Sequence, residues 1–527
     1  MKHPLLFALA VLVTSTAPVA AQTNANVLAP LLAREIIGPN LALAEVQNYT
    51  ETRVPRVPSV RTVAEWEQAA LRLRRDVLEQ VVFRGVARQW RDARTKVEWL
   101  DTIAGGPGYR IRKVRYEALP GLWIPALLYL PENLTGKVPV HLAVNGHDRV
   151  GKAAPYKQLR CINLAKRGVI TLNVEWLNMG RLRTAGSAHY AMNQLDLCGT
   201  SGIAPFFLAM SRGLDLLLGL READPQRVAV SGLSGGGWQT IFISSLDPRV
   251  TLANPVAGYS SFRTRIRNFS DLGDSEQTPC DLATVVDYTH LTAMLAPRSA
   301  LLTYNAKDNC CFATDHALQP LLDAAQPVFK LLNAAGKLRW HNNLVPGTHN
   351  FEQENREMLY RMVGDTFFPG SKQFVATEIP SAGEVKSPAE LEVPLPADNL
   401  DFNRLAQGLM KSLPHQQVQP AEPAKLRNWQ ASERAALRQV VRAVDYRVTA
   451  EKAGTSITNG LSTTFWRLRM GDAWTVPAVE LSQGNPSATV LLVGDAGRKG
   501  LAREAEVQLN SGHRVVVVDP FYFGESR

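Results

Sequence analysis

The stretch Arg227-Val-Ala-Val-Ser-Gly-Leu-Ser-Gly-Gly-Gly-Trp-Gln-Thr-Ile-Phe-Ile243 decides the fold of the region around it. A short β-branched run is followed directly by Gly232-Leu-Ser-Gly-Gly236 and then by an apolar helical pattern. A G-x-S-x-G sequence between a strand and a helix is typical of a nucleophile elbow. In so tight a turn, side chains at 232 and 236 collide with the neighbouring strand and helix, which favours glycine. The stretch therefore predicts that Ser234 is a reactive serine at the rim of a sheet.

A nucleophilic serine needs a base, and the base needs a carboxylate that orients it. On α/β-hydrolase folds these residues follow one another as Ser, Asp or Glu, and His. Asp308 comes just after the apolar run 299–304, and His349 is carried past the predicted strand 338–344 by a Pro-Gly turn. All three residues then lie at the edge where open α/β sheets bind ligands, which predicts a Ser234–Asp308–His349 triad. The alternative acids are Asp315 and Asp287, and the less well placed alternative bases are His316 and His341.

An oxyanion hole requires two backbone amides aimed at the developing negative charge. The residue after the nucleophile, Gly235, supplies one. The strand 138–144 ends in Asn-Gly-His-Asp, and the glycine lets the chain turn back, so His147 is expected to supply the second amide, with Asp148 as the alternative. Two tryptophans are candidates either for pocket walls or for core packing: Trp176 and Trp238.

The order of the predicted elements is typical of an α/β protein, a mostly parallel sheet with helices on both faces. An antiparallel hairpin is expected around Pro120-Gly121, and residues 96–370 form the predicted catalytic domain, with a polar insertion at about 259–297 as a cap. Residues 22–95 are expected to form an N-terminal extension and helical layer, and residues 371–430 a Pro-rich linker. The other predicted strands are 169–174, 227–231 and 251–256, and the predicted helices are 155–167, 205–221 and 352–363.

The tail, residues 431–527, resembles the beginning of the same domain. The segment 512–524 aligns without gaps on 168–180, and the strand and turn 488–500 match the region around 138–152. The tail therefore predicts a partial second hydrolase-like α/β unit without catalytic residues. Because a half sheet leaves an unpaired edge, we expect a truncated copy, and a degenerate interaction module is the alternative.

The N-terminus has the pattern of a secretory signal peptide. A basic start is followed by the apolar run 5–13 and by small residues at Val19 and Ala21. We therefore expect cleavage after residue 21 and an exported protein, periplasmic or secreted. After cleavage no apolar stretch is long enough to span a bilayer, so no membrane association is predicted.

Charge and cysteine content exclude several other classes of function. The excess of 58 basic over 48 acidic residues is scattered along Arg-rich helices without aromatic interleaving, which disfavours nucleic-acid binding. The five cysteines form no C-x-x-C motif and no zinc spacing with histidine, so no metal site and no cofactor are predicted. Their pairing stays open between a bridge from Cys280 to Cys310 or Cys311 and small buried free thiols. The oligomeric state also stays open. The cysteines are Cys161, Cys198, Cys280, Cys310 and Cys311.

Four segments carry a resemblance to a known family. They are Asn193-Gln-Leu-Asp-Leu-Cys-Gly-Thr-Ser-Gly202, Gly232-Leu-Ser-Gly-Gly-Gly-Trp-Gln-Thr240, Asn305-Ala-Lys-Asp-Asn-Cys-Cys-Phe312 and Pro346-Gly-Thr-His-Asn-Phe351. Residues 100–370 resemble exported bacterial α/β-hydrolases described as acetylxylan-esterase-like or prolyl-oligopeptidase-like. The resemblance implies the same triad and a carboxylic ester as substrate. The Arg-Gly-Gln segment of cephalosporin-C and acetylxylan deacetylases and the Gly-Cys-Ser-Arg elbow of glucuronoyl esterases are both absent.

These features predict a serine hydrolase of carboxylic esters, acting on a small-molecule or carbohydrate ester through an acyl-enzyme. A serine peptidase of the prolyl-oligopeptidase type is an alternative, although the hundred or so upstream residues cannot build the propeller that such enzymes carry. A non-catalytic binding protein on the same fold is the other alternative.

Overall fold

The computed structural model describes residues 24–414 and 419–527, so the predicted signal peptide lies outside the described residues. The chain divides into two compact units. The larger unit runs from Thr50 to Gln417, and the smaller one combines residues up to Tyr49 with those from Val418 onward.

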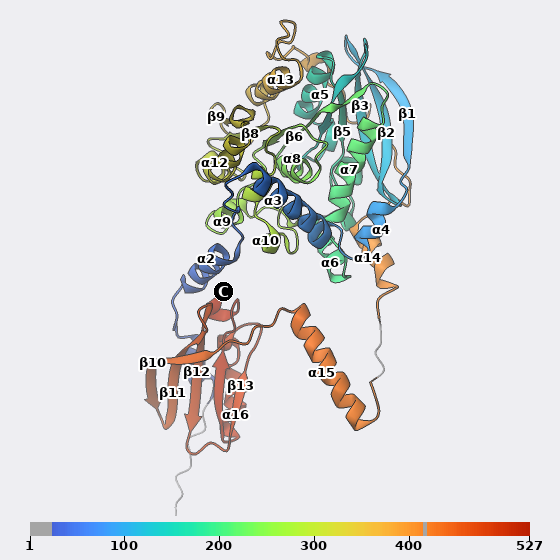
Figure 1. The fold of residues 1–527 in the computed structure, drawn as a ribbon. Coiled ribbons are helices and arrows are strands. Elements are labelled where there is room, and N and C mark those ends of the chain that lie inside the picture. The colour runs from blue at the N-terminus through green and yellow to red at the C-terminus, as the bar shows by residue number, and fades with distance from the viewer. Residues whose placement is uncertain (1–23, 415–418) are drawn as a thin grey trace, which may run out of the picture. The chain divides into compact units, whose positions relative to one another are not determined.

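The described part of the larger unit is built on a nine-stranded sheet in the order β1-β2-β3-β5-β4-β6-β7-β8-β9 (Figure 1). The strands from β5 to β9 in this order run parallel to one another, and β1, β2 and β3 join one edge in antiparallel pairs. The predicted hairpin is confirmed as the pair β2–β3. The strands are β1 Val97–Ala104, β2 Tyr109–Leu119, β3 Leu122–Pro131, β4 Val138–Ala143, β5 Ile170–Val174, β6 Ala223–Leu233, β7 Leu252–Val256, β8 Ser299–Asn305 and β9 Leu338–Asn343.

Helices cover both faces of this sheet, as the sequence predicts. Because side chains alternate along a strand, Ala300 and Leu302 of β8 pack in the core shared with α7, α8 and α12, whereas Leu301 packs on the opposite side with α13. Leu164 of α5 belongs to the α13 side. The helices on the two faces and in the connecting segments are α5 Pro155–Lys166, α6 Asn193–Leu197, α7 Ala204–Leu218, α8 Gly235–Leu246, α12 Thr314–Leu331 and α13 Gln353–Phe367.

The insertion at 259–297 is a set of short helices packed into the larger unit. Tyr288 and Leu291 are fully buried in its main core, and the Tyr288 hydroxyl accepts a hydrogen bond from Trp238 of α8. The short elements are α9 Phe262–Arg265, η6 Phe269–Asp271, η7 Ser275–Gln277, α10 Leu282–Val285 and α11 Tyr288–Ala293.

The predicted N-terminal layer is divided between the two units, which differs from the sequence prediction. From α3 onward it packs on the larger unit, where Trp66 and Val81 are buried in the core. Helix α1 instead places Leu28 and Leu32 on the sheet of the smaller unit, because that sheet offers an apolar face to cover. The helices are α1 Ala25–Ala33, α2 Leu41–Arg53, α3 Val63–Asp76, the π-helical η1 Val77–Val82 and α4 Ala87–Asp92.

Much of the segment 371–430 is packed, which differs from the predicted linker. Leu391 and Val393 are buried against the strand pair β2–β3, and Phe402 and Leu405 of α14 (Phe402–Met410) join the main core. These few apolar residues bury parts of the segment in the cores of the larger unit. The later helix α15 (Pro423–Val440) contains no buried residue.

The smaller unit holds a second sheet, as the sequence repeat predicts. Its order, within the described residues, is β10-β11-β12-β14-β13, with β13 and β14 parallel and the other pairs antiparallel. Helix α16 connects β13 to β14. The elements are β10 Val448–Thr458, β11 Leu461–Met470, β12 Trp474–Gln483, β13 Ala488–Leu492, α16 Ala502–Asn510 and β14 His513–Val518.

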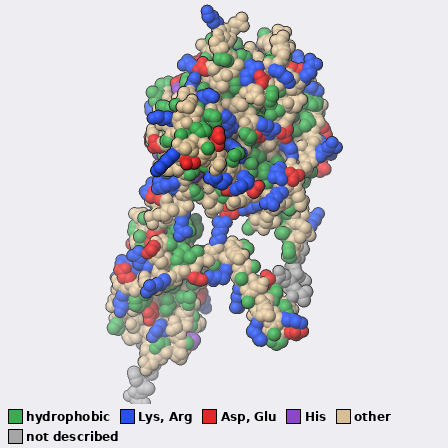
Figure 2. Space-filling view, viewed as in Figure 1, with side chains coloured by type: hydrophobic (Ala, Val, Ile, Leu, Met, Phe, Trp, Pro, Cys, Tyr) green, Lys and Arg blue, Asp and Glu red, His purple; other side chains and the backbone are tan. Residues whose placement is uncertain are grey.

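One face of the molecule shows the scattered charges that the sequence predicts. On the face seen in Figure 2, Lys and Arg side chains are scattered among Asp and Glu. Within residues 24–414 and 419–527, every helix is too short or too polar to cross a bilayer.

Candidate active site

Ser234 occupies the turn between β6 and α8, in a backbone conformation that side chains rarely adopt. Its φ of 61° and ψ of −122° are held by the N–H, which donates to the Val256 carbonyl at 2.9 Å, and by the carbonyl, which accepts from Trp238 N–H at 2.9 Å. A Cβ on Gly232 would lie 2.4 Å from the Val144 carbonyl oxygen. The strained serine is thus fixed by a turn that requires glycine beside it.

Asp308 and His349 form a pair on the loops that follow β8 and β9. Nδ1 of His349 lies 2.9 Å from Oδ2 and 3.0 Å from Oδ1 of the carboxylate, which is fully buried. The carboxylate also accepts hydrogen bonds from Asn305 Nδ2 and from the amides of Cys310 and Cys311. With four donors around it, the carboxylate is held in place, and it sets the orientation of the imidazole.

The pair shifts the ionisation of both residues. Burial opposes a charge on His349, but the hydrogen bond and negative charge of Asp308 outweigh it and raise the pKa of the imidazole above its usual value. Burial likewise opposes the charge of Asp308, but the bond from His349 and the neighbouring donors outweigh it and lower the pKa of the carboxyl. Asp308 therefore stays ionised wherever His349 titrates.

Ser234, Asp308 and His349 all follow the carboxyl ends of parallel strands and so lie at one edge of the sheet. Of the three, Asp308 and His349 are joined by hydrogen bonds, and among the described contacts none joins Ser234 to His349. Catalytic hydrogen bonds are often long in unliganded sites and tighten when substrate binds.

The alternative acids and bases have other partners. Asp315 is exposed and lies 2.7 Å from His316, and His316 also contacts Asp271. Asp287 caps α11, and His341 lies in β9 beside Glu354. None of these four lies beside Ser234 or His349 in the described contacts.

The loop after β4 passes directly against the nucleophile turn. A Cβ on Gly146 would lie 3.1 Å from Ser234 Cβ and 3.0 Å from the amide nitrogen of Gly235, which begins α8. The two amides predicted for an oxyanion hole, those of Gly235 and His147, thus belong to two neighbouring segments of backbone. Gly146 is required here because of this close approach.

The two predicted tryptophans have different positions. The Trp176 ring lies over Gly235, where an added Cβ would be 1.9 Å from the ring, and it packs against the His147 ring with centroids 4.6 Å apart. Trp238 is fully buried in the core and donates to the Tyr288 hydroxyl at 2.8 Å. Trp238 is therefore a core residue, and Trp176 is the one beside the nucleophile.

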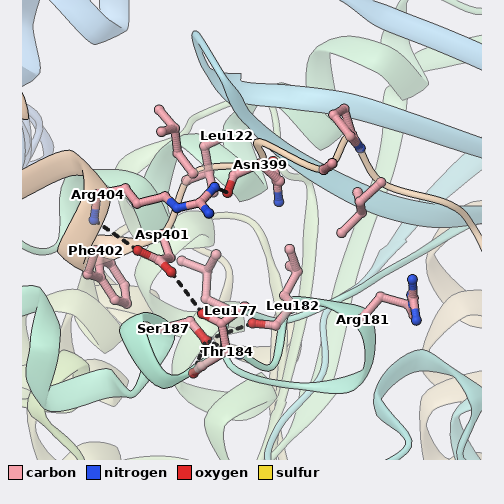
Figure 3. Close-up of a pocket in the computed structure, with 14 residues that line it drawn as sticks. Leu122, Leu177, Arg181, Leu182, Thr184, Ser187, Asn399, Asp401, Phe402 and Arg404 are labelled. Carbon is pink, nitrogen blue, oxygen red and sulfur yellow. Dashed lines mark hydrogen bonds between the residues drawn. The ribbon is translucent and has the colours of Figure 1, made fainter.

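A pocket of about 320 Å³ lies between the loop after β5 and the segment before α14. In Figure 3, Asp401 is bonded both to Thr184, whose hydroxyl donates at 2.9 Å, and to the amide of Arg404. Leu177 and Phe402 form part of its apolar wall. Ser234, Asp308 and His349 do not line this pocket.

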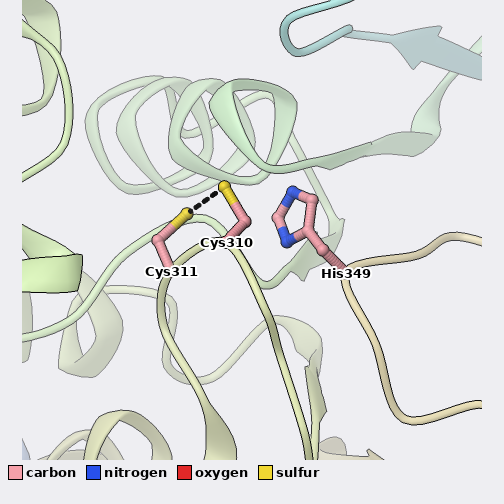
Figure 4. A group of neighbouring side chains, drawn as sticks. All are labelled: Cys310, Cys311 and His349. Carbon is pink, nitrogen blue, oxygen red and sulfur yellow. Dashed lines mark hydrogen bonds between the residues drawn. The ribbon is translucent and has the colours of Figure 1, made fainter.

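All five cysteines are free thiols. Cys310 and Cys311 lie beside His349, with their sulfur atoms 3.2 Å apart, as Figure 4 shows. A disulfide from Cys280 is therefore absent from the described residues, and the loop around Asp308 is held by its hydrogen bonds instead.

One cluster of polar side chains was missed by the sequence analysis. His147, His189, Asp274 and Glu276 each offer a ligand atom, and these atoms all lie within 4.8 Å of one another. Burial lowers the pKa of His147 to about 4, whereas for His189 burial is outweighed by the carboxylate of Glu276, which raises its pKa. The four residues come from three loops and have no regular spacing, so no sequence motif predicts the cluster.

Comparisons with known proteins bear on the fold. No protein-family model matches the chain, and no curated protein matches it. Among solved structures, the methylesterase BT1017 aligns with a TM-score of 0.51 and 17% identity over 76% of this chain and 80% of its own. A glucuronoyl esterase from Solibacter usitatus aligns at 0.46 with 17% identity, covering 59% and 98%, and acetyl xylan esterase 1 from Thermoanaerobacterium sp. at 0.41 with 14% identity, covering 62% and 98%.

The strand order, the turn at Ser234 and the likeness to the methylesterase structure agree with one another. The larger unit of this chain has the α/β-hydrolase fold.

Proposed function

We propose that this protein is a serine hydrolase of carboxylic esters, with a carbohydrate ester as the substrate class. The observation that carries the proposal is the strained turn at Ser234 on the same sheet edge as the buried Asp308–His349 pair. The fold shared with a protein named methylesterase supports this class of reaction.

In the proposed reaction His349 accepts the proton of Ser234 as its oxygen attacks the ester carbonyl. Asp308 holds Nδ1–H of the imidazole, so that Nε2 is free to accept that proton. The amides of Gly235 and His147 stabilise the oxyanion. His349 then returns the proton to the departing alcohol, and water releases the acid from the acyl-enzyme by the same steps.

The two alternative functions differ in what they require. A prolyl-oligopeptidase-type peptidase carries a propeller of strands ahead of its hydrolase domain, whereas the described residues 24–96 form helices and connecting segments. A binding protein on this fold does not need the strained serine conformation.

Export through residues 1–21 is part of the proposal and follows from the sequence pattern alone.

The test is hydrolysis of p-nitrophenyl acetate by the full chain and by Ser234→Ala. We expect the variant to lose hydrolysis and labelling by a fluorophosphonate while keeping its circular dichroism spectrum. Ser371→Ala, at an exposed serine, is the matched control and should behave as the unmodified protein. Full activity of Ser234→Ala would place the nucleophile elsewhere.

The substrate class is tested with acetylated xylan, feruloyl esters, methyl-esterified uronates, simple p-nitrophenyl esters and prolyl peptides. A carbohydrate ester should give the highest kcat/KM. Cleavage of the peptides in preference to every ester would favour the peptidase instead.

A further inference from the structure

The cluster of His147, His189, Asp274 and Glu276 joins three segments of the larger unit beside the nucleophile. His147 lies on the loop after β4, His189 begins the short helix η5 (His189–Met192), and Asp274 and Glu276 flank the start of η7 in the insertion. His147 Nε2 lies 3.0 Å from Asp274 Oδ2 and 3.3 Å from His189 Nδ1, and His189 Nδ1 lies 3.0 Å from Glu276 Oε2.

The hydrogen bonds around His189 determine which of its nitrogens faces the cluster. Nε2 lies 2.9 Å from the Leu177 carbonyl, which can only accept, so Nε2 carries the hydrogen. In the neutral ring, Nδ1 then directs its lone pair at the carboxylate of Glu276. A backbone carbonyl that fixes the imidazole in this way is the usual outer partner of a metal-binding histidine.

The burial of Glu276 also points to a bound cation. Its side chain has no exposed surface, and its one side-chain partner among the described contacts is Nδ1 of His189, 3.0 Å from Oε2. A buried carboxylate with a single partner is costly to keep charged unless a cation compensates it. A ring nitrogen and a carboxylate oxygen 3.0 Å apart hold either a proton or a metal ion between them.

Charge and spacing fit a divalent metal ion. Two carboxylates and two neutral imidazoles carry two negative charges, which one divalent cation balances. Four ligands at about 2.0–2.1 Å in a tetrahedron lie about 3.3 Å from one another. Three of the six separations in the cluster are close to this value, and the other three lie within 4.8 Å. Two histidines with two carboxylates suit zinc better than calcium or magnesium, which prefer oxygen ligands alone.

We propose that His147, His189, Asp274 and Glu276 bind one divalent transition-metal ion of the zinc class. His147 and Asp274 are 38% and 48% exposed and give the ion a path of entry, whereas His189 and Glu276 form the buried floor. Four protein ligands leave no open position, so the ion has a structural role. It ties the insertion to the loop that passes against Ser234.

The proposal does not depend on the proposed ester hydrolysis, and its first readout is metal content. The full chain is stripped with dipicolinate, loaded with zinc, desalted and analysed by mass spectrometry for zinc per chain. We expect about one zinc per chain and a higher melting temperature than for the stripped protein. Cobalt in place of zinc should give the intense visible bands of tetrahedral coordination.

Two variants test the ligands. Glu276→Gln should lower zinc affinity by more than 100-fold, and Asp274→Asn, at a half-exposed position that the fold tolerates, should lower it at least tenfold. His316→Gln, at a histidine paired with Asp271 outside the cluster, is the matched control and should keep its zinc.

Cys310→Ser separates this site from the other group of metal-binding side chains, Cys310, Cys311 and His349. We expect it to retain zinc. The proposal is overturned if the unmodified chain takes up no zinc, since a proton shared by His189 and Glu276 then accounts for the cluster. It is also overturned if Cys310→Ser loses the ion while Asp274→Asn and Glu276→Gln keep it.

Discussion

The first five strands of the larger sheet have the same order as the five strands of the smaller sheet. Among the described residues, the candidate active site lies on the larger sheet. The order β1-β2-β3-β5-β4 in the larger unit corresponds to β10-β11-β12-β14-β13 in the smaller one. In both, a helix connects the two parallel strands, α5 in the first and α16 in the second. We refer to these regions as the first and second copies.

Each copy contains a buried ion pair at the same place. In the first copy, Glu175 accepts from the Lys152 amide at 2.6 Å and pairs with its ammonium group at 3.0 Å. In the second, Asp519 accepts from the Arg498 amide at 2.5 Å, and its other oxygen lies 3.6 Å from the guanidinium. The ion pair therefore belongs to the five strands and connecting helix that the two copies share, which we call the frame. In the frame the pair fixes the turns after two neighbouring strands.

The copies differ in the loop after the first parallel strand. Residues 144–150 separate β4 from the turn at Gly151, whereas only residues 493–496 separate β13 from Gly497. The longer loop carries His147 and the close approach of Gly146 to Ser234. From the comparison we infer that the shared strands supply stability, while the proposed ester hydrolysis depends on the longer loop and on the strands from β6 onward.

The largest effect on activity is expected from a substitution outside both copies. Asp308→Asn should lower kcat by on the order of 10⁴, because an amide stabilises the wrong tautomer of His349 and cannot balance its charge. Ester hydrolysis measures the loss of activity, and thermal unfolding of the variant measures any loss of stability. Asp315→Asn, at an exposed carboxylate, is the control, and a larger loss of activity there would transfer the role to Asp315.

Substituting the buried carboxylate in each copy tests whether stability and ester hydrolysis depend on different parts of the chain. Glu175→Gln leaves the Lys152 ammonium buried without its partner and should cost about 3–5 kcal/mol of unfolding free energy. Asp519→Asn should cost less, because Arg498 also pairs with Glu525. Calorimetry of the full chain follows both changes.

The kinetics of these two variants sharpen the comparison. Glu175→Gln should also reduce kcat/KM, because its turn adjoins the loop of His147, whereas Asp519→Asn should leave hydrolysis unchanged. Equal losses of activity in the two variants would contradict a division between a structural frame and a chemical loop.

The pH dependence of hydrolysis should report the ionisation of His349, which lies outside both copies. His349 must be neutral to accept the serine proton, so kcat/KM should rise with pH through the pKa of this imidazole. Asp308 raises that pKa above the usual 6.5, so the midpoint should lie above this value, with a tenfold loss for each pH unit below it. In Asp308→Asn the midpoint should move to lower pH, and an unchanged midpoint would exclude His349 as the titrating base.

Much of the larger unit could be predicted from the sequence, because long apolar runs specify buried strands. The run at 299–304 became β8, Ser299–Asn305, and the elbow motif placed Ser234 between a strand and a helix. Strand β1 was missed because its residues are mostly half-buried or exposed and show no regular alternation.

The cluster of His147, His189, Asp274 and Glu276 could not be predicted for a different reason. Its members are brought together by the path of three loops, and neither period nor spacing in the sequence encodes that path. The packing of Leu391 was missed for a similar reason, since a single apolar residue in a Pro-rich segment carries no periodic signal.

The smallest expected effect comes from matched glycines of the two copies. Gly180 and Gly524 both have positive φ, and an added Cβ would lie 2.4 Å from the Glu175 carboxylate and 2.2 Å from that of Asp519. Gly168 and Gly512 also have positive φ, of 82° and 79°, but an added Cβ meets nothing within 4 Å. Alanine at 168 or 512 should therefore cost only the backbone strain, about 1 kcal/mol.

Alanine at 180 or 524 should cost about 1 kcal/mol more than at the open positions, because it also displaces the buried carboxylate from its partner. Chemical denaturation of the four variants measures both differences. If the frame is shared as the ion pairs indicate, the extra cost should be present in both copies. An extra cost at 180 without one at 524 would mean that the second ion pair is loose, and that the second copy keeps the strand order of the first without its rigidity.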